Sequence, residues 1–221
     1  MMDSEPTSRR PAPRAGGDPA ACASNRERLI QVAAVLFHDE GYHHVSLDRV
    51  LDASGVARSN FYYHFRSKED LAIAVMDTWL ERLRATVVAP ALADPSLPAL
   101  ERVRRILDGL LDQLEVAGCR GGCPFGSLAN AEAEHNERFR QKLVETFDGF
   151  ARMLEALFAE AAAQGAIDDR RAPVDLAAAT LALVQGGFLL TKTYAGATPM
   201  RIAVRGLLEL LGVDPDARRA M

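Results

Sequence analysis

The sequence predicts an all-α fold of about nine helices, flanked by short tails. Apolar residues recur at three- and four-residue spacing from residue 24 to about residue 212. No useful stretch shows the apolar–polar alternation of a β-strand, and Gly or Pro punctuates the periodic segments. With 221 residues, of which 48% are hydrophobic, the chain is long enough to bury a sizeable core.

The two ends differ from the periodic part. Residues 1–23 are rich in Pro, Gly, Ala and Ser and are predicted to be disordered. Arginines in this segment allow an arm that enters a DNA minor groove, but nearby acids dilute the charge and favour a solvated tail. We expect a helix-turn-helix domain over 24–66, a larger helical domain over 67–212, and a C-terminal tail over 213–221.

Three short helices are expected within 24–66. The first carries an apolar stripe and ends at Gly41, a favourable C-cap residue. The second begins after Ser46, which has the side chain of an N-cap, and ends at Gly55. The third covers about residues 58–64, after a turn at 54–57. Two short helices joined by a turn that contains Gly form a helix-turn-helix pattern.

Longer helices follow in 67–212. Ser67 and Asp70 have the spacing of a capping box and begin the fourth helix. Prolines at 90, 95 and 98 break the chain. Helices are then expected over about 100–117, from Pro124, over about 139–165, and over 173–194. The last helix, in which Thr198 is the N-cap, ends near residue 212.

Charge is distributed unevenly. The formal net charge is −4, so any DNA-binding surface must be locally basic. Between Val56 and Lys68 the only charged side chains are the cations Arg58, Arg66 and Lys68. Lys68 falls in the first turn of the fourth helix, where a cation opposes the helix dipole. A phosphate docked beside Lys68 would explain this position.

The third helix has a buried side and a polar side. Phe61 and Phe65 are four residues apart and are expected to anchor the helix to the core. Arginine reads guanine and asparagine reads adenine in the major groove, whereas Tyr and Ser suit phosphate oxygens. The remaining side chains can all form hydrogen bonds: Arg58, Ser59, Asn60, Tyr63 and His64.

Residues 26–75 resemble the DNA-binding domain of the TetR/AcrR family of bacterial repressors. The matching motifs are Phe37-x-x-x-Gly41-Tyr42, Ser46-Leu47, Ala53-Ser54-Gly55-Val56, Phe61-Tyr62-Tyr63-His64-Phe65 and Ser67-Lys68-Glu69-Asp70-Leu71. The resemblance implies contacts to double-stranded DNA from Ser46, Arg58, Ser59, Asn60, Tyr62, Tyr63, His64 and Lys68. Two positions depart from the family pattern: Ala57 stands where many relatives carry Ser or Thr, and Ser59 where Gly is frequent.

The resemblance is weaker over 67–212, where it implies a small-molecule effector pocket and a homodimer. Two-fold symmetry of the dimer would require a palindromic operator. The last two helices are apolar on more than one side, as expected for helices at an interface. Interface residues are predicted to be Leu181, Val184, Phe188, Leu207, Leu208 and Leu211. Pocket residues, each of which is also a candidate for plain core, are predicted to be Met76, Trp79, Leu83, Leu107, Leu111, Phe125, Leu128, Phe147, Phe150, Met153 and Gln185.

The predicted function is a ligand-responsive regulator of transcription, a repressor by the family's default. A largely apolar effector would release it from DNA by shifting its conformational population. The N-terminus has no apolar stretch for a signal peptide, and no apolar run approaches the roughly 18 residues that span a bilayer. We therefore expect a cytoplasmic protein with no membrane partner, no cofactor and no metal.

Other functions remain open at this point. Cys119 and Cys123 allow a redox switch, but the preferred interpretation is that they are two small residues in a Gly-rich loop. Two thiols are too few for a structural zinc site. An enzyme would have its site in the polar segment 132–137, which a solvated helix face explains better. A dimeric interaction protein without DNA binding is the third hypothesis. The polar chemistry of the third helix favours the regulator over the interaction protein.

Overall fold

The structure is a computed structural model that describes residues 24–168 and 170–214. Within these residues the secondary structure is helical, with no strand, which confirms the predicted all-α fold class. The predicted tail 1–23 and most of the tail 213–221 lie outside the described residues. The elements are α1 (Asn25–Asp39), α2 (Leu47–Ser54), α3 (Arg58–His64), α4 (Lys68–Leu83), the π-helical turn η1 (Arg84–Val88), α5 (Ala89–Leu92), α6 (Ala99–Val116), α7 (Pro124–Glu132), α8 (Glu137–Ala163), α9 (Pro173–Tyr194) and α10 (Thr198–Leu210).

The helix boundaries follow from local side-chain chemistry. Ser46 Oγ accepts a hydrogen bond from the Arg49 N–H at 3.1 Å, and Gly55 ends α2 in the left-handed conformation, as predicted. Ser67 caps α4, but the Asp70 carboxylate accepts from the Arg66 N–H and leaves the capping box incomplete. The N-cap of α10 is Ala197, one residue before the predicted Thr198.

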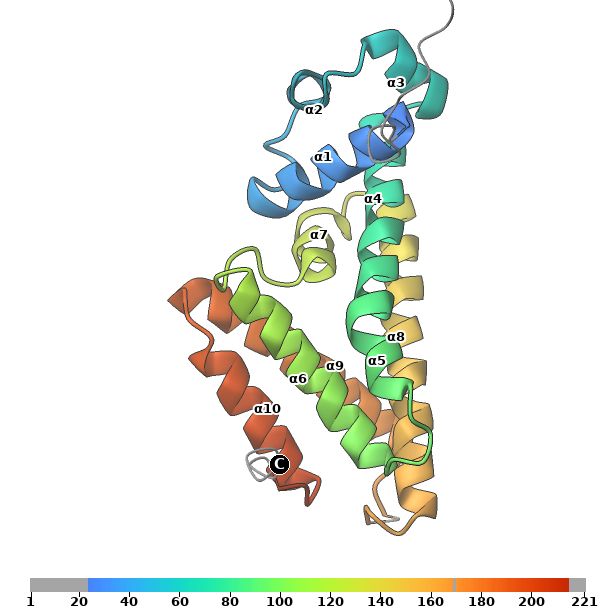
Figure 1. Cartoon of the computed structure of the whole chain (residues 1–221), viewed down its shortest axis with the longest axis vertical. Helices are drawn as coiled ribbons and strands as arrows, with labels where there is room; N and C mark the ends of the chain where they lie inside the picture. The colour runs from blue at the N-terminus through green and yellow to red at the C-terminus, as the bar shows by residue number, and fades with distance from the viewer. Residues whose placement is uncertain (1–23, 169, 215–221) are drawn as a thin grey trace, which may run out of the picture.

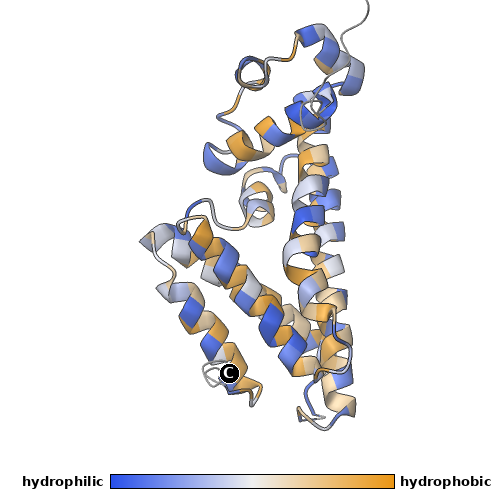
Figure 2. Cartoon of the chain, viewed as in Figure 1, coloured by the Kyte–Doolittle hydropathy of each residue, from blue (hydrophilic) through white to orange (hydrophobic). Residues whose placement is uncertain are grey.

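Helices α1–α3 form one end of the molecule, and the longer helices form the other (Figure 1). Because α4, η1 and α5 continue into one another, they correspond to one of the nine expected helices. One hydrophobic core joins α1–α3 to α4, α7 and the first half of α8. A second core joins α6, the second half of α8, α9 and α10. Figure 2 shows apolar and polar residues interleaved along α6, as expected for an amphipathic helix.

Helix α9 departs from one expectation. By length and composition alone it is apolar enough to cross a membrane, a property shared by core helices of soluble proteins. The expectation that no apolar run approaches the length needed to span a bilayer is therefore wrong for α9. Only 28% of its most apolar window is buried within the protomer, so much of that apolar surface has no cover from this chain.

Candidate nucleic-acid interface

Helix α3 is held rigidly from beneath. The rings of Phe61 and Phe65 are 0% and 5% exposed, and Val56 fills the space beside the turn. Gly55, at φ +64°, makes this turn without a Cβ penalty. The predicted anchors are confirmed, so the outer side chains of α3 project from a fixed frame.

The outer side of α3 is exposed and polar. Tyr63 is 82% exposed and Tyr62 is 53% exposed, while Ser59 and Asn60 also face solvent. His64 is half-buried and packs edge-on against Tyr63, with ring centroids 4.8 Å apart. These side chains, together with the exposed Ser46 at the start of α2, are free to meet a DNA backbone or a base edge.

Arg58 has a partner within the protein. Its guanidinium forms an ion pair with the Asp48 carboxylate on α2. Both side chains are more than half exposed, so the pair contributes little to stability and leaves the guanidinium accessible from solvent. Ala57, at the N-cap of α3, provides no side-chain hydrogen bond, as its departure from the family pattern implied.

The structure gives Lys68 a different explanation from the one predicted. Its Nζ donates hydrogen bonds to the backbone carbonyls of Tyr42 at 2.7 Å and Val45 at 2.8 Å. It also lies 4.0 Å from the centroid of the Tyr42 ring, a cation–π contact. Partial burial lowers the pKa of Lys68. A cation at this helix start therefore needs no phosphate, and the resemblance is the remaining support for a phosphate contact.

Tyr42 joins the helix-turn-helix to the larger domain. Its ring makes edge contacts with Phe37 of α1 and Phe139 of α8, at centroid distances of 5.3 and 5.2 Å. Burial, reinforced by the carboxylates of Glu132 and Glu69, raises the pKa of Tyr42 to about 12. Nothing in the local sequence around Tyr42 predicts its contact with Phe139 of α8, which only the packed fold creates.

The segment around α7 also touches the DNA-binding helices. Glu132 Oε1 lies 2.9 Å from His43 Nε2, in the loop between α1 and α2. Gly121, in the loop before α7, lies so close to the His38 ring of α1 that an added Cβ would overlap it. Asn136 Nδ2 donates to Glu69 Oε2 on α4 at 2.6 Å. The contacts of Glu132 with His43 and of Gly121 with His38 thus connect the two predicted domains, and the bond from Asn136 to Glu69 ties the segment after α7 to α4.

These contacts correct the interpretation of segment 132–137 as one solvated face. Glu132 is only 5% exposed, whereas Glu134 and His135 face solvent and Glu137 pairs with Arg140 at 2.6 Å. The segment does not converge on a common point. Among the described residues, no group of three His, Cys, Asp or Glu is placed to hold a metal ion.

The thiol of Cys123 has a structural role. Its Sγ accepts from the backbone N–H of Gly126 and from Gln185 Nε2, both at 3.4 Å, and caps α7. Burial raises the pKa of Cys123, which reduces its thiolate fraction and weakens the redox hypothesis. Gln185, predicted to line an effector pocket, is the hydrogen-bond partner of this thiol.

The predicted pocket residues fall into two groups. Phe150 and Met153 line a groove between α8 and the end of α4. Eight others pack in the two hydrophobic cores, and their place in an effector pocket stays a prediction. The buried ones are Met76, Leu107, Phe125 and Leu128, and the partly buried ones are Trp79, Leu83, Leu111 and Phe147.

Four of the six predicted interface residues pack inside the protomer, and the interface itself stays a prediction. Each is less than a tenth exposed because it packs into the protomer's own second core: Val184, Leu207, Leu208 and Leu211. Leu181 and Phe188 are partly exposed, so a partner could still contact them. The exposed apolar side chains of these helices are others, namely Val174, Leu189, Leu190 and Tyr194 on α9 and Ile202 and Leu210 on α10.

A rigid frame under an exposed, polar α3, attached to a larger helical domain, defines a helix-turn-helix DNA-binding protein. Residues 29–75 match the family profile "Bacterial regulatory proteins, tetR family". Residues 99–207 match "Tetracyclin repressor-like, C-terminal domain". The chain belongs to the TetR family of bacterial transcriptional regulators.

Individual relatives agree over most of the chain. The transcriptional regulator AcuR of Cereibacter sphaeroides is 28% identical, covering 89% of this chain and 88% of that protein. The regulator LmrA of Bacillus subtilis is 28% identical, covering 80% and 90%. A crystal structure of a TetR regulatory protein from Rhodobacter sphaeroides superposes with a TM-score of 0.76 at 27% identity, covering 83% and 96%. One from Chloroflexus aurantiacus gives 0.77 at 27% identity, covering 85% and 94%.

Proposed function

We propose that this protein is a repressor that binds a palindromic operator as a homodimer and is released by a small effector. The observation that carries the proposal is the exposed polar surface of α3 on its buried phenylalanine frame. Arg58 and Asn60 are the residue types that read guanine and adenine, and Tyr63 is exposed beside them. Among the relatives, DhaR of Mycobacterium sp. carries the name of a repressor.

The uncovered apolar sides of α9 and α10 support the homodimer. Leu189 is 59% exposed and Ile202 is 66% exposed, although both belong to strongly apolar helices. Gly186 and Gly206 lie within the same helices, and a Cβ at either would meet open space. Small residues without neighbours in their own chain permit the close approach of a partner's helix. A second copy of this chain would cover both sides at once.

The contacts at α7 support release by an effector. Because Gly121 and Glu132 touch α1 and the loop after it, a shift of α7 would displace the helix-turn-helix relative to α4. An effector that binds the shifted arrangement more tightly would then lower the affinity for DNA. The loss of DNA-binding free energy equals the loss of effector-binding free energy when DNA is bound. In the cytoplasm, where operator DNA resides, both partners would be accessible.

A mobility-shift assay on the promoter region next to the protein's own gene tests this function. We expect the promoter fragment to be retained specifically. A plot of the logarithm of the binding constant against the logarithm of the salt concentration should fall with a slope of about 0.9 for each phosphate contact. Replacing Asn60 by Ala should relax the sequence preference, at a cost of about 1–3 kcal/mol. Absence of specific retention at low salt would exclude the proposed function.

The dimer is tested separately by sedimentation. Ile202→Asp should convert the dimer to a monomer and abolish specific operator binding, because it would bury a charge at the interface. Val35→Asp is the matched control, since Val35 is 60% exposed on α1, far from α9 and α10 in sequence. A dimer that tolerates Ile202→Asp would show that another surface joins the protomers.

A further inference from the structure

A groove lies between the end of α4 and the middle of α8. Its volume is about 420 Å³, in the lower part of the range of small-molecule sites. The α4–η1–α5 side and the α8 side both contribute largely apolar walls. The lining residues that the argument uses are Leu80, Arg84, Val88 and Leu92 on one side and Gly149 and Met153 on the other.

The π-helical turn aligns one wall of this groove. In an α-helix, residues four apart drift by about 40° around the axis, so three such steps would rotate a side chain by about 120°. The wider turn at Arg84–Val88 offsets this drift. Leu80, Arg84, Val88 and Leu92 consequently all face the groove. A π-turn is rare within helices and is frequent at functional sites.

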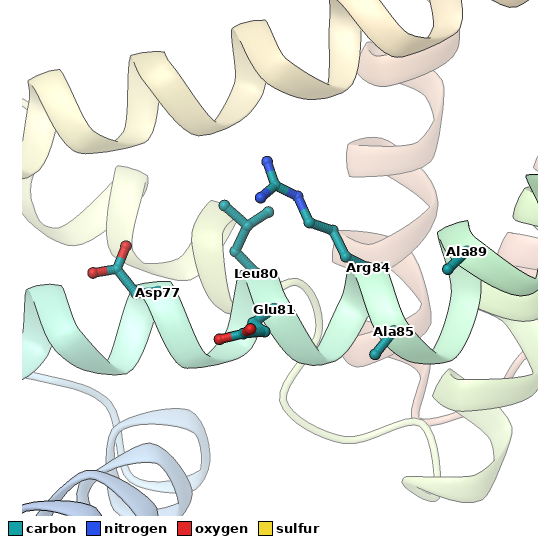
Figure 3. Close-up of a pocket in the computed structure, with 6 residues that line it drawn as sticks. All are labelled: Asp77, Leu80, Glu81, Arg84, Ala85 and Ala89. Atoms are coloured by element: carbon teal, nitrogen blue, oxygen red, sulfur yellow. The ribbon is translucent and has the colours of Figure 1, made fainter.

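Arg84 brings a positive charge into this groove. Figure 3 shows its guanidinium extending from the helix toward the neighbouring α8 ribbon, beside Leu80. Within the described residues it forms no ion pair and no hydrogen bond. The Asp77 carboxylate on the same helix is paired with Lys142 at 2.5 Å. Glu145 also lines the groove, one turn before Gly149, but forms no ion pair with Arg84.

Gly149 keeps space open on the opposite wall. It lies in the middle of α8, where glycine weakens a helix relative to alanine. An added Cβ would meet nothing within 4 Å, so no packing within this chain accounts for a glycine here. A ligand that lies against the α8 backbone does account for it.

We propose that this groove binds a small organic monocarboxylate with an apolar chain. Arg84 would bind the carboxylate through charge-assisted hydrogen bonds, and the chain would lie along Val88, Leu92 and Met153 over Gly149. Glu145, which also lines the groove, disfavours a second negative charge on the ligand. The inference rests on the proposed function, because it identifies the chemical class of the effector.

Isothermal titration calorimetry with straight-chain acids from butanoate to decanoate tests the ligand class. We expect at least one acid to bind about tenfold more tightly than its primary amide and than the corresponding dicarboxylate. Arg84→Gln should remove the preference for acid over amide. Arg82→Gln, at an exposed arginine on the same helix that does not line the groove, should retain it. Gly149→Leu should weaken acid and amide alike by filling the open space.

Two results would overturn the proposal: no acid of the series binds, or Arg84→Gln binds acids as the unaltered protein does. A mobility-shift assay without ligand distinguishes this failure from failure of the regulator. Arg84→Gln should bind the operator normally but should no longer be released by the acid. If the operator is bound and no acid releases it, the inference fails and the proposed repressor stands. If nothing binds the operator, the repressor fails, and calorimetry still decides the groove.

Discussion

Replacing Lys68 by Met tests whether the ammonium at the start of α4 is a structural clamp. The substitution removes two hydrogen bonds, to the carbonyls of Tyr42 and Val45, and two cation–π contacts, with the rings of Tyr42 and Phe37. Each hydrogen bond from a charged group contributes about 1.5–3 kcal/mol when buried, and the closer cation–π contact, with Tyr42, contributes about 0.5–1 kcal/mol. Because the side chain is half-buried and its carbonyl partners can be rehydrated, we expect a net loss of about 2 kcal/mol.

For a chain of this size, that loss lowers Tm by about 4–8 °C. Urea unfolding followed by circular dichroism measures the free energy directly. Lys142→Met is the matched control, because Lys142 forms a single ion pair with Asp77 near the surface, which contributes less than about 1 kcal/mol. A loss below about 0.5 kcal/mol for Lys68→Met would refute the clamp.

The same variant also tests the phosphate contact that the family resemblance implies. If Nζ remains on its two carbonyls in the DNA complex, the salt dependence of operator binding should be unchanged. We expect this result, since the existing partners are at 2.7 and 2.8 Å. A slope smaller by about 0.9 per protomer would show that Lys68 turns to a phosphate when DNA binds.

Three further predictions follow from other contacts. Asp48→Asn frees Arg58 and removes a negative charge beside DNA, so operator affinity in a mobility shift should rise severalfold, and a decrease would contradict the role assigned to the pair. Gly121→Ala combines strain at φ +78° with overlap on the facing imidazole of α1 and should cost about 2–4 kcal/mol in urea unfolding. Gly118→Ala, at φ +67° with open space around it, should cost only about 1–2 kcal/mol, and equal losses would exclude the overlap. Because the pKa of Tyr42 is about 12 in the folded protein and about 10 when unfolded, stability should be full below pH 10 and fall between about pH 10 and 12. Tyr42→Phe should remove that part of the alkaline loss, and an unchanged pH profile would contradict the shift.

The helix-turn-helix was predictable because its determinants are local. Ser46 caps a helix through an N–H three residues away, and Gly55 adopts a backbone conformation that other residues avoid. Phe61 and Phe65 share a side because they are four residues apart in one helix. Each of these rules acts within a single turn, so the sequence alone contains the information.

The partners of Lys68 and the exposed apolar surface of α9 were not predictable for a physical reason. Lys68 bonds carbonyls 23 and 26 residues earlier in the chain, and only the packed fold brings them together. Helix α9 is apolar nearly all round, so periodicity cannot separate Val184, which faces its own core, from Leu189, which faces outward. Burial in the structure makes that distinction.

The predicted boundary at residue 66 divides the sequence but does not divide the packing. Phe37 and Phe61 of the first region share one continuous core with Leu71 of α4 and Phe139 of α8. The helix-turn-helix is therefore packed directly on the helices that enclose the groove, with no flexible linker between them. A ligand that separates α4 from α8 must also change the surface on which α1 rests. Coupling between effector binding and DNA binding would then require no long pathway. It would require only that α4 packs against the helix-turn-helix and against α8.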